Sequence, residues 1–132
     1  MKLKHFNLMI GTQILKAFSE EARTRIMHLL YRNNEMCISD IELVLDFTQT
    51  KTSRHLIYLK NSGLVTSRKI DQWTFYSIKD ELKGFVEIIY TYMEKDLLLM
   101  NDQETYQTLY SNRELAINKI EARKWRKPPL PL

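Results

Sequence analysis

The residues best suited to chemistry lie between positions 49 and 69, a segment that contains bases but no acid. Its Lys and Arg residues are Lys51, Arg54, Lys60, Arg68 and Lys69. Residues 35–46, just upstream, show the opposite pattern, with four acids and no base. A concentrated basic segment can neutralise the phosphates of a nucleic acid, and counterion release makes such binding weaken with salt. An isolated charge run more often forms a solvated face, so the surrounding elements must decide between the two interpretations.

A predicted helix over residues 49–61 carries a set of polar side chains on one face. The members of this set are Gln49, Thr50, Ser53 and Arg54. An arginine can bind guanine O6 and N7 as a fork, a glutamine can bind adenine, and a hydroxyl can bond to bases or phosphates. For each hydroxyl residue, a solvated helix surface is an equally good interpretation. His55 is expected to pack toward the protein body rather than to touch DNA.

Capping signals mark the ends of the elements that hold this face. Thr48 is the predicted N-cap of the helix at residues 49–61, and Gly63 can adopt the left-handed conformation that follows a helix end. Ser39 and Glu42 have the spacing of a capping box, which predicts a short helix just upstream. The basic helix is therefore expected to follow a short helix after a tight turn.

Two longer helices are predicted before this pair. Apolar residues spaced three and four apart around Ile14 indicate the first helix. Ser19 is the predicted N-cap of the second helix, which buries its apolar face and turns Arg23, Arg25 and Arg32 outward. The region upstream of residue 35 is thus expected to be helical.

Residues 64–66 and 73–78 are rich in β-branched and aromatic side chains and predict a two-stranded hairpin. A helical period then continues to Met100, and we expect a break at Asn101–Asp102 before an additional C-terminal helix. This order of elements is that of a winged helix-turn-helix, in which the helix after the turn enters the DNA major groove. The predicted fold is mainly α with a small β-hairpin.

The length of 132 residues predicts a single compact unit with a short appendage. We expect residues 1–100 to form a winged helix-turn-helix domain for DNA binding and dimerisation, and residues 101–127 to form a C-terminal helical extension. Residues 128–132 contain all three prolines and are expected to be a disordered tail. The net charge of +4 permits a polyanionic partner without requiring one.

The same stretches resemble the ArsR family of bacterial winged-helix repressors. The resemblance rests on the order and spacing of several segments and covers roughly residues 15–82. The matching segments are 15–18, 23–26, 35–41, 49–56, 62–65 and 73–78, together with Leu59.

The resemblance implies a DNA-contacting role for the polar face of the helix at residues 49–61 and for the hairpin residues Lys69 and Gln72. With the charge pattern, it gives a candidate DNA-binding set of Gln49, Thr50, Lys51, Ser53, Arg54, Lys60, Arg68, Lys69 and Gln72. The hairpin turn departs from the family, because Asp71–Gln72 stands where Gly-Arg is common. The family commonly dimerises through the first and last helices of its winged core, which implies a homodimer on palindromic double-stranded DNA, with half-sites about 34–36 Å apart.

Many relatives release DNA when they bind a metal, but the ligands for such a site are missing. The family's thiolate pair is reduced to Cys37, with Ser39 at the second position, and one soft ligand cannot form a tridentate site. Residues 80–100 contain acids but no histidine. We therefore expect neither a metal nor a cofactor, and we expect Cys37 to be a small buried side chain. The alternative is a regulator that senses redox chemistry at Cys37 or an unidentified small-molecule inducer in the C-terminal helices.

Other function classes receive little support. The sequence contains no Gly-rich phosphate loop and no recognisable nucleophile–base arrangement, so an enzyme is not expected. A winged helix used for protein contact would keep the fold but would not need a basic, acid-free helix. Since no signal-peptide pattern is found and no apolar stretch approaches the ~20 residues of a membrane span, we expect a cytoplasmic protein without a membrane partner.

Overall fold

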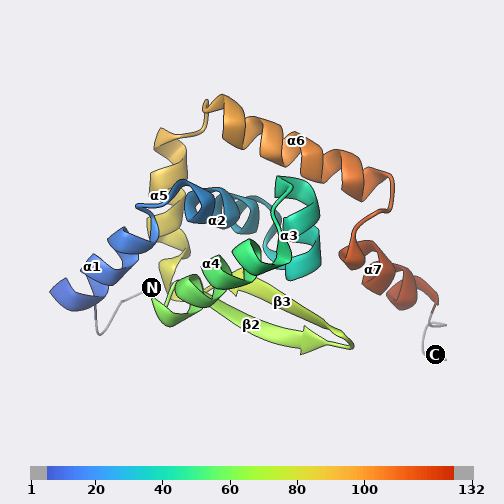
Figure 1. Cartoon of the computed structure of the whole chain (residues 1–132), viewed down its shortest axis with the longest axis horizontal. Coiled ribbons are helices and arrows are strands. Elements are labelled where there is room, and N and C mark those ends of the chain that lie inside the picture. Colours follow the sequence, from blue (N-terminus) through green and yellow to red (C-terminus); the bar gives the residue numbers. More distant parts are fainter. Residues whose placement is uncertain (1–5, 127–132) are drawn as a thin grey trace, which may run out of the picture.

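The computed structural model describes residues 6–126 of the chain, with side chains for residues 6–122. Helices α3 and α4 form a helix-turn-helix, and the β2–β3 hairpin that follows is the wing (Figure 1). This confirms the predicted mainly α winged helix-turn-helix. The elements in order are α1 (Leu8–Ala17), α2 (Glu21–Asn33), β1 (Glu35–Cys37), α3 (Ile38–Leu45), α4 (Gln49–Asn61), β2 (Val65–Ile70), β3 (Trp73–Ile78), the 3₁₀ turn η1 (Asp80–Leu82), α5 (Lys83–Tyr92), α6 (Leu97–Ser111) and α7 (Ala116–Arg126).

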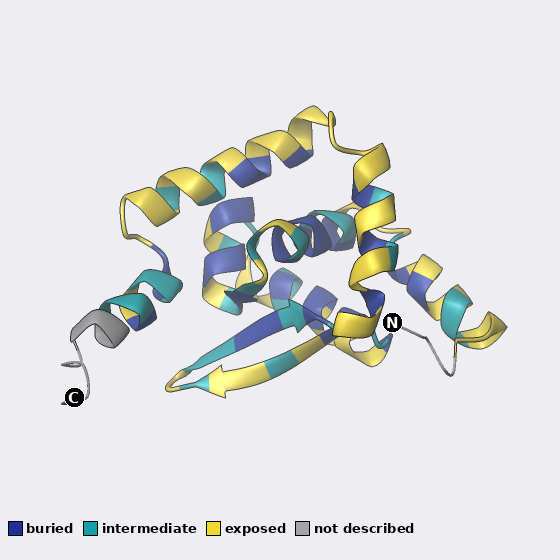
Figure 2. Ribbon diagram, turned by 180° about the vertical axis from the view of Figure 1, so that it is seen from behind, coloured by how far each residue is buried: buried dark blue, intermediate teal, exposed yellow. Residues whose placement is uncertain are grey.

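Helix α2 is the centre of the core. Its side chains Ile26, Met27 and Leu29 are fully buried, because α2 is contacted by α4, α5, α6 and β3. Figure 2 shows buried residues on the inner faces of the helices and a largely exposed outer surface on α5 and α6. Burial of apolar area is the main favourable term in folding, so α2 is the support against which α4 is positioned.

The sheet has three strands rather than the two of the predicted hairpin. β1 pairs antiparallel with β3, with Met36 opposite Tyr76, and the strand order is β1-β3-β2. A strand of three residues is too short to show an alternating pattern, and its partner lies far away in the sequence. The hairpin turn itself contains Asp71 in the left-handed region, with φ of 56°.

The predicted ends of α4 are confirmed. The Thr48 hydroxyl accepts a hydrogen bond from the Lys51 backbone N–H at 3.2 Å, which satisfies one of the free amides in the first turn. Gly63 has φ of +86°, a conformation that a residue with a Cβ rarely adopts. Both signals act within a few residues of the helix, which is why the sequence alone is sufficient to predict them.

The predicted cap at Ser19 is wrong. α2 begins at Glu21, with Glu20 at the N-cap position and no side chain bonded to the free amides there. Ser19 instead donates its hydroxyl to the carbonyl of Lys16 at 2.6 Å, at the end of α1. Because the link between the two helices is short, Ser19 bonds to the end of α1 instead of to the start of α2.

The capping box predicted at Ser39 and Glu42 is also wrong. α3 begins at Ile38, and no side chain caps its first turn. Ser39 therefore lies inside the helix, where its hydroxyl oxygen is 3.1 Å from the sulfur of Cys37. The cause is β1, since it pairs with β3 as far as Cys37 and leads directly into the helix.

The break in the C-terminal helices occurs at residues 93–96 rather than at Asn101–Asp102, which lie inside α6. Asp96 is the N-cap of α6, where its carboxylate accepts the backbone N–H of Leu99 at 3.0 Å. A second break separates α6 from α7, so two helices follow α5 instead of one. The expected boundary at residue 100 falls within α6, and residues 128–132 lie outside the described part of the chain.

Helices α6 and α7, called the C-terminal extension below, are joined to the winged core by polar contacts. The Arg25 guanidinium donates Nε and Nη2 to the Asp102 carboxylate at 3.0 and 2.9 Å. Asn33 and Gln103 exchange two amide hydrogen bonds of 2.8 Å. The extension is therefore fixed to α2 along its first helix.

Candidate nucleic-acid interface

The outer face of α4 presents the polar set predicted from the sequence. Gln49, Thr50 and Arg54 are exposed, and Ser53 is half-buried on the same face. The opposite face buries Thr52 together with Leu56 and Leu59, and this fixes which side of α4 faces solvent. The structure thus brings together all four residues that could contact base edges.

Lys51 lies beside this face. Its Nζ is 4.1 Å from the centroid of the Phe47 ring, a cation–π distance. Phe47 belongs to the turn between α3 and α4, so the ammonium group is held near the first turn of the helix. This placement suits a contact with a phosphate, which requires a point charge rather than a planar fork.

The buried side of α4 is connected to α1 by Arg23, which was predicted to face outward and is in fact buried. Its Nε and Nη2 donate to the carbonyls of Ala17 and Lys16 at 2.9 and 3.2 Å. Its Nη1 is 3.5 Å from His55 Nδ1, and the guanidinium carbon is 3.9 Å from the centroid of the Tyr58 ring. One cation thus bridges the C-terminal end of α1 and helix α4, which is the second helix of the helix-turn-helix and is called the recognition helix below.

His55 is 5% exposed, which confirms that it packs toward the protein body. Burial lowers the pKa of His55, and the nearby positive charges of Arg23 and Arg54 lower it further. The neutral imidazole can accept a hydrogen bond from Arg23, whereas an imidazolium would face a like charge. Sequence reasoning missed this role of Arg23, because its acceptors come from a different helix.

Arg68 of the wing and Lys60 at the end of α4 are less available than the sequence implied. Arg68 donates Nε and Nη2 to the two carboxylate oxygens of Glu35, both at 2.7 Å. Glu35 lies on β1, the strand that sequence reasoning missed, so this ion pair could not be foreseen. Lys60 Nζ donates to the hydroxyl of Ser67 at 2.8 Å. Both side chains are already held in place by protein groups.

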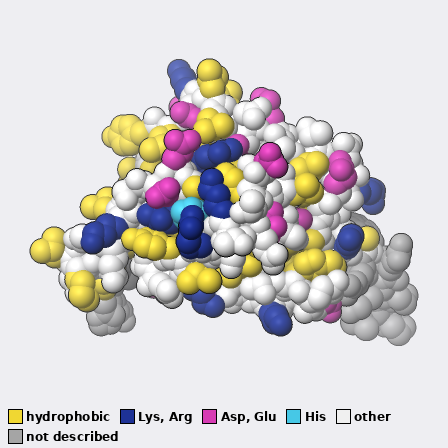
Figure 3. Space-filling view, in the orientation of Figure 1, with side chains coloured by type: hydrophobic (Ala, Val, Ile, Leu, Met, Phe, Trp, Pro, Cys, Tyr) yellow, Lys and Arg dark blue, Asp and Glu magenta, His cyan; other side chains and the backbone are white. Residues whose placement is uncertain are grey.

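Lys69 and Gln72 are exposed near the tip of the hairpin. They lie on the wing, apart from the polar face of α4, as expected from the sequence. In Figure 3, Lys and Arg side chains gather beside a histidine over α2 and α4, on the face turned toward the viewer. The candidate residues therefore form a main group on α4 and a smaller group on the wing.

Cys37 is buried beneath α7 and is 1% exposed. Burial raises the pKa of its thiol to about 11, although the hydrogen bond with Ser39 opposes the shift. Since the thiolate is the reactive form, alkylation by iodoacetamide at pH 8 is expected to be about a hundredfold slower in the folded chain than in urea. Mass spectrometry at timed intervals measures both rates. Equal rates in the two conditions would contradict this assignment of Cys37 as a buried small side chain.

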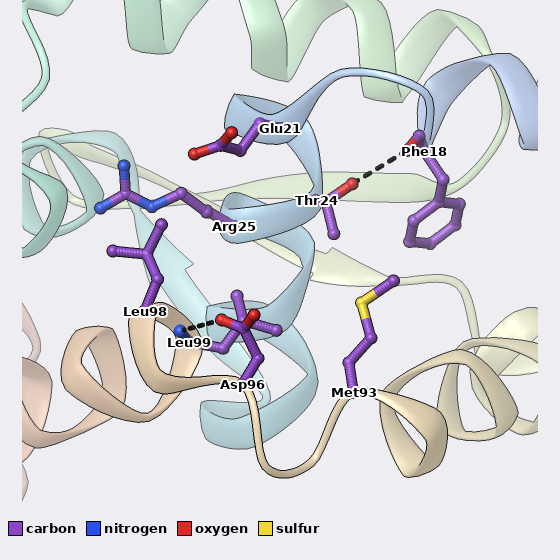
Figure 4. Close-up of a pocket in the computed structure, with 8 residues that line it drawn as sticks. All are labelled: Phe18, Glu21, Thr24, Arg25, Met93, Asp96, Leu98 and Leu99. Atoms are coloured by element: carbon purple, nitrogen blue, oxygen red, sulfur yellow. Dashed lines mark hydrogen bonds between the residues drawn. The ribbon is translucent and has the colours of Figure 1, made fainter.

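Two further features bear on ligand binding. Within the described residues, no group of three or more His, Cys, Asp or Glu side chains could hold a metal. A cavity of about 320 Å³ lies between α2 and the α5–α6 junction, lined by residues that include Thr24, Arg25 and Met93. Figure 4 shows Met93 and Leu98 reaching from that junction toward α2. The Arg25 guanidinium beside this cavity is already bound to Asp102.

Three tyrosines of α5 and α6 contact other groups of the protein, whereas Tyr92 is 89% exposed. The Tyr90 hydroxyl donates to the carbonyl of Thr24 at 2.6 Å, and its ring stacks on Tyr31 with centroids 5.4 Å apart. Tyr106 stacks on Tyr110 at 5.9 Å. None of the helices within residues 6–126 has the length and apolar character needed to cross a bilayer.

Comparison with known proteins places the winged part of the chain among bacterial regulators. A family model described as "Bacterial regulatory protein, arsR family" matches residues 20–67. The arsenical resistance operon repressor of Escherichia coli is 34% identical over 79 residues, which are 60% of this chain and 68% of that protein. The chain spans 58% and 64% of the two arsenic resistance transcriptional regulators of Pseudomonas putida that it also matches.

Solved structures agree with this result. HlyU from Vibrio cholerae has a TM-score of 0.60 and 31% identity, over 66% of this chain and 95% of that one. A homodimeric winged helix-turn-helix DNA-binding domain from Mycobacterium bovis has a TM-score of 0.61 over 68% of this chain and 83% of that one. At 23% identity the latter shows a shared fold. The relatives named here are regulators rather than enzymes, in agreement with the expectation from the sequence.

Proposed function

Because the chain belongs to the ArsR family of bacterial regulatory proteins, we propose that it is a transcriptional repressor that binds a palindromic operator as a homodimer. The observation that carries the proposal is the exposed polar face of α4, which lies in the acid-free segment 49–69. In this arrangement α4 enters the major groove and the wing lies on the flanking backbone.

The candidate residues divide into two roles. Gln49, Thr50, Ser53 and Arg54 are proposed to contact base edges, because they share the outer face of α4. The remaining residues are proposed to contact the phosphate backbone, where a charge or a donor is sufficient. These backbone contacts are Lys51, Lys60, Arg68, Lys69 and Gln72. Among the charged residues of this group, Arg68 makes the weakest contribution, since Glu35 offsets its charge.

A homodimer is supported by the apolar side chains that α1 and α5 leave exposed. Leu8, Met9 and Leu15 of α1 are 87%, 67% and 62% exposed. Ile88 and Tyr92 of α5 are 60% and 89% exposed. Large exposed apolar side chains grouped on two helices suit an interaction site, and a two-fold axis would place the same surface on both partners. Residues 1–100 would then supply both the DNA-binding and the dimerisation surfaces.

Titration of labelled random-sequence duplex DNA at several salt concentrations tests the proposal. We expect binding whose logarithm falls linearly with the logarithm of salt, by about 0.9 for each phosphate contacted. Analytical ultracentrifugation of the free chain tests the dimer, which we expect Leu15→Glu to dissociate. Absence of DNA binding at low salt would favour the competing class, a winged helix used for protein contact.

A further inference from the structure

Helix α7 is packed against the wing. Ala116 and Ile120 are buried in a cluster with Cys37 and Phe75, and Ile117 packs against the same cluster. The wing residues Ile70 and Trp73 also pack against it. Figures 1 and 2 view the molecule from opposite sides, and both show α7 on the side to which the hairpin tip points. α7 is therefore a neighbour of the proposed DNA-binding surface.

The start of α7 is fixed to the helix-turn-helix by a buried carboxylate. Asp40 of α3 is 3% exposed and accepts the backbone N–H of Ala116 at 2.7 Å and of Ile117 at 3.2 Å. These are free amides in the first turn of a helix, which normally bind a side chain of their own segment. Because Asp40 belongs to α3, the position of α7 is set relative to the element that precedes the recognition helix.

The charge of α7 is strongly basic along one stripe. Lys119 is exposed, and the helical spacing i, i+4, i+7 places positions 123 and 126, both arginine, on the same stripe of the helix. The one acid in α7, Glu121, accepts a hydrogen bond from the Tyr110 hydroxyl at 2.5 Å. The stripe therefore carries bases without an intervening acid.

The dimensions of the stripe suit a nucleic-acid backbone. From position 119 to position 126 the helix rises by about 10 Å, and the phosphates of one DNA strand advance by about 3.4 Å per nucleotide along the axis. Three bases over this length therefore span about three nucleotide steps of one strand. The wing itself offers few free bases, since Arg68 is paired with Glu35 and the turn contains Asp71.

We propose that α7 is a second backbone-binding element, which contacts DNA phosphates outside the segment covered by the wing. This inference rests on the proposed DNA-binding function and assigns a role to the C-terminal extension. The three bases at positions 119, 123 and 126 supply positive charge to the flanking DNA. The wing contributes little such charge. The contact is independent of sequence, because it involves phosphates alone.

The test uses the full chain and an operator selected from a random library by the wild-type protein. Lys119→Gln, Arg123→Gln and Arg126→Gln are combined in one variant, and Arg32→Gln, Lys83→Gln and Lys95→Gln form a control that removes three exposed bases elsewhere. On a duplex with long flanks, we expect the α7 variant to lose at least tenfold in affinity and to lower the salt slope by about 0.9 for each lost phosphate contact. The control variant should change neither quantity to this extent.

Trimming the duplex to the edge of the wing-protected region should abolish the difference between the α7 variant and wild type. A charge-conserving variant, Arg123→Lys with Arg126→Lys, should bind nearly as tightly as wild type, which separates the effect of charge from that of side-chain shape. If the α7 variant behaves like the control, or if trimming the flanks leaves its defect unchanged, the inference is overturned while the proposed function stands. If wild-type protein binds no duplex at all, both fail.

Discussion

Replacing Asp102 by alanine is expected to lower the free energy of unfolding by about 3 kcal/mol, the lower end for breaking a buried ion pair. The carboxylate accepts two hydrogen bonds from Arg25, and the exposed fractions of the two side chains are only 3% and 19%. Without Asp102 the guanidinium stays largely buried without a counter-ion, and a main attachment of α6 to α2 is lost. Urea unfolding monitored by circular dichroism measures the effect.

Asp80→Ala is the matched control for this experiment. Asp80 pairs with Lys83 at 3.0 Å, but the two side chains are 80% and 55% exposed. Exposed pairs contribute little, because solvent screens the charges, so the urea midpoint should not move measurably. An Asp102→Ala variant that unfolds at the wild-type midpoint would show that the extension is not attached through this pair.

Arg54→Ala is expected to weaken binding to the selected operator by about 1–3 kcal/mol, roughly a factor of 5 to 150 in the dissociation constant. The reason is the loss of a planar donor pair that can bind guanine O6 and N7 at once. Because one base pair is then no longer read, we expect the preference at a single operator position to disappear. Affinity measured against operators substituted at each position gives both quantities.

Lys51→Ala provides the comparison for Arg54→Ala. Lys51 is held over Phe47 at the start of α4, where it is positioned for a phosphate. Its loss should weaken all duplexes about equally and reduce the salt slope by about 0.9, without changing base preference. Unchanged affinity in both variants would place the DNA-binding face elsewhere on the molecule.

The recognition helix could be predicted from the sequence because its signals are local. Thr48, Gly63 and the apolar spacing of Leu56 and Leu59 all act within the helix or within two residues of its ends. The same is true of the polar face, since helical periodicity alone decides which side chains share it. Helical periodicity alone therefore puts four of the nine candidate DNA-binding residues on one surface.

What the sequence did not show depends on contacts between distant segments. β1 has three residues, and its pairing with β3 joins positions about forty apart. Arg68 is bound by Glu35 only because that strand exists. Arg23 is of a residue type that usually lies at the surface, yet its guanidinium donates to carbonyls at the end of α1. Such pairings follow from the tertiary arrangement, and the residue pattern within one helix or strand cannot predict them.

Arg23 has a consequence for how two copies would meet DNA. It ties the end of α1 to the buried His55 and to the exposed Tyr58, both on α4. In a dimer joined through α1, the α4 helix of each protomer would then be tied through Arg23 to the helix that forms the interface. The distance and relative rotation of the two α4 helices would be set at the dimer interface rather than by any hinge near the DNA. A compound that slightly shifted this interface would move the two α4 helices away from the spacing of successive major grooves. It would do so without contacting any residue of the DNA-binding surface.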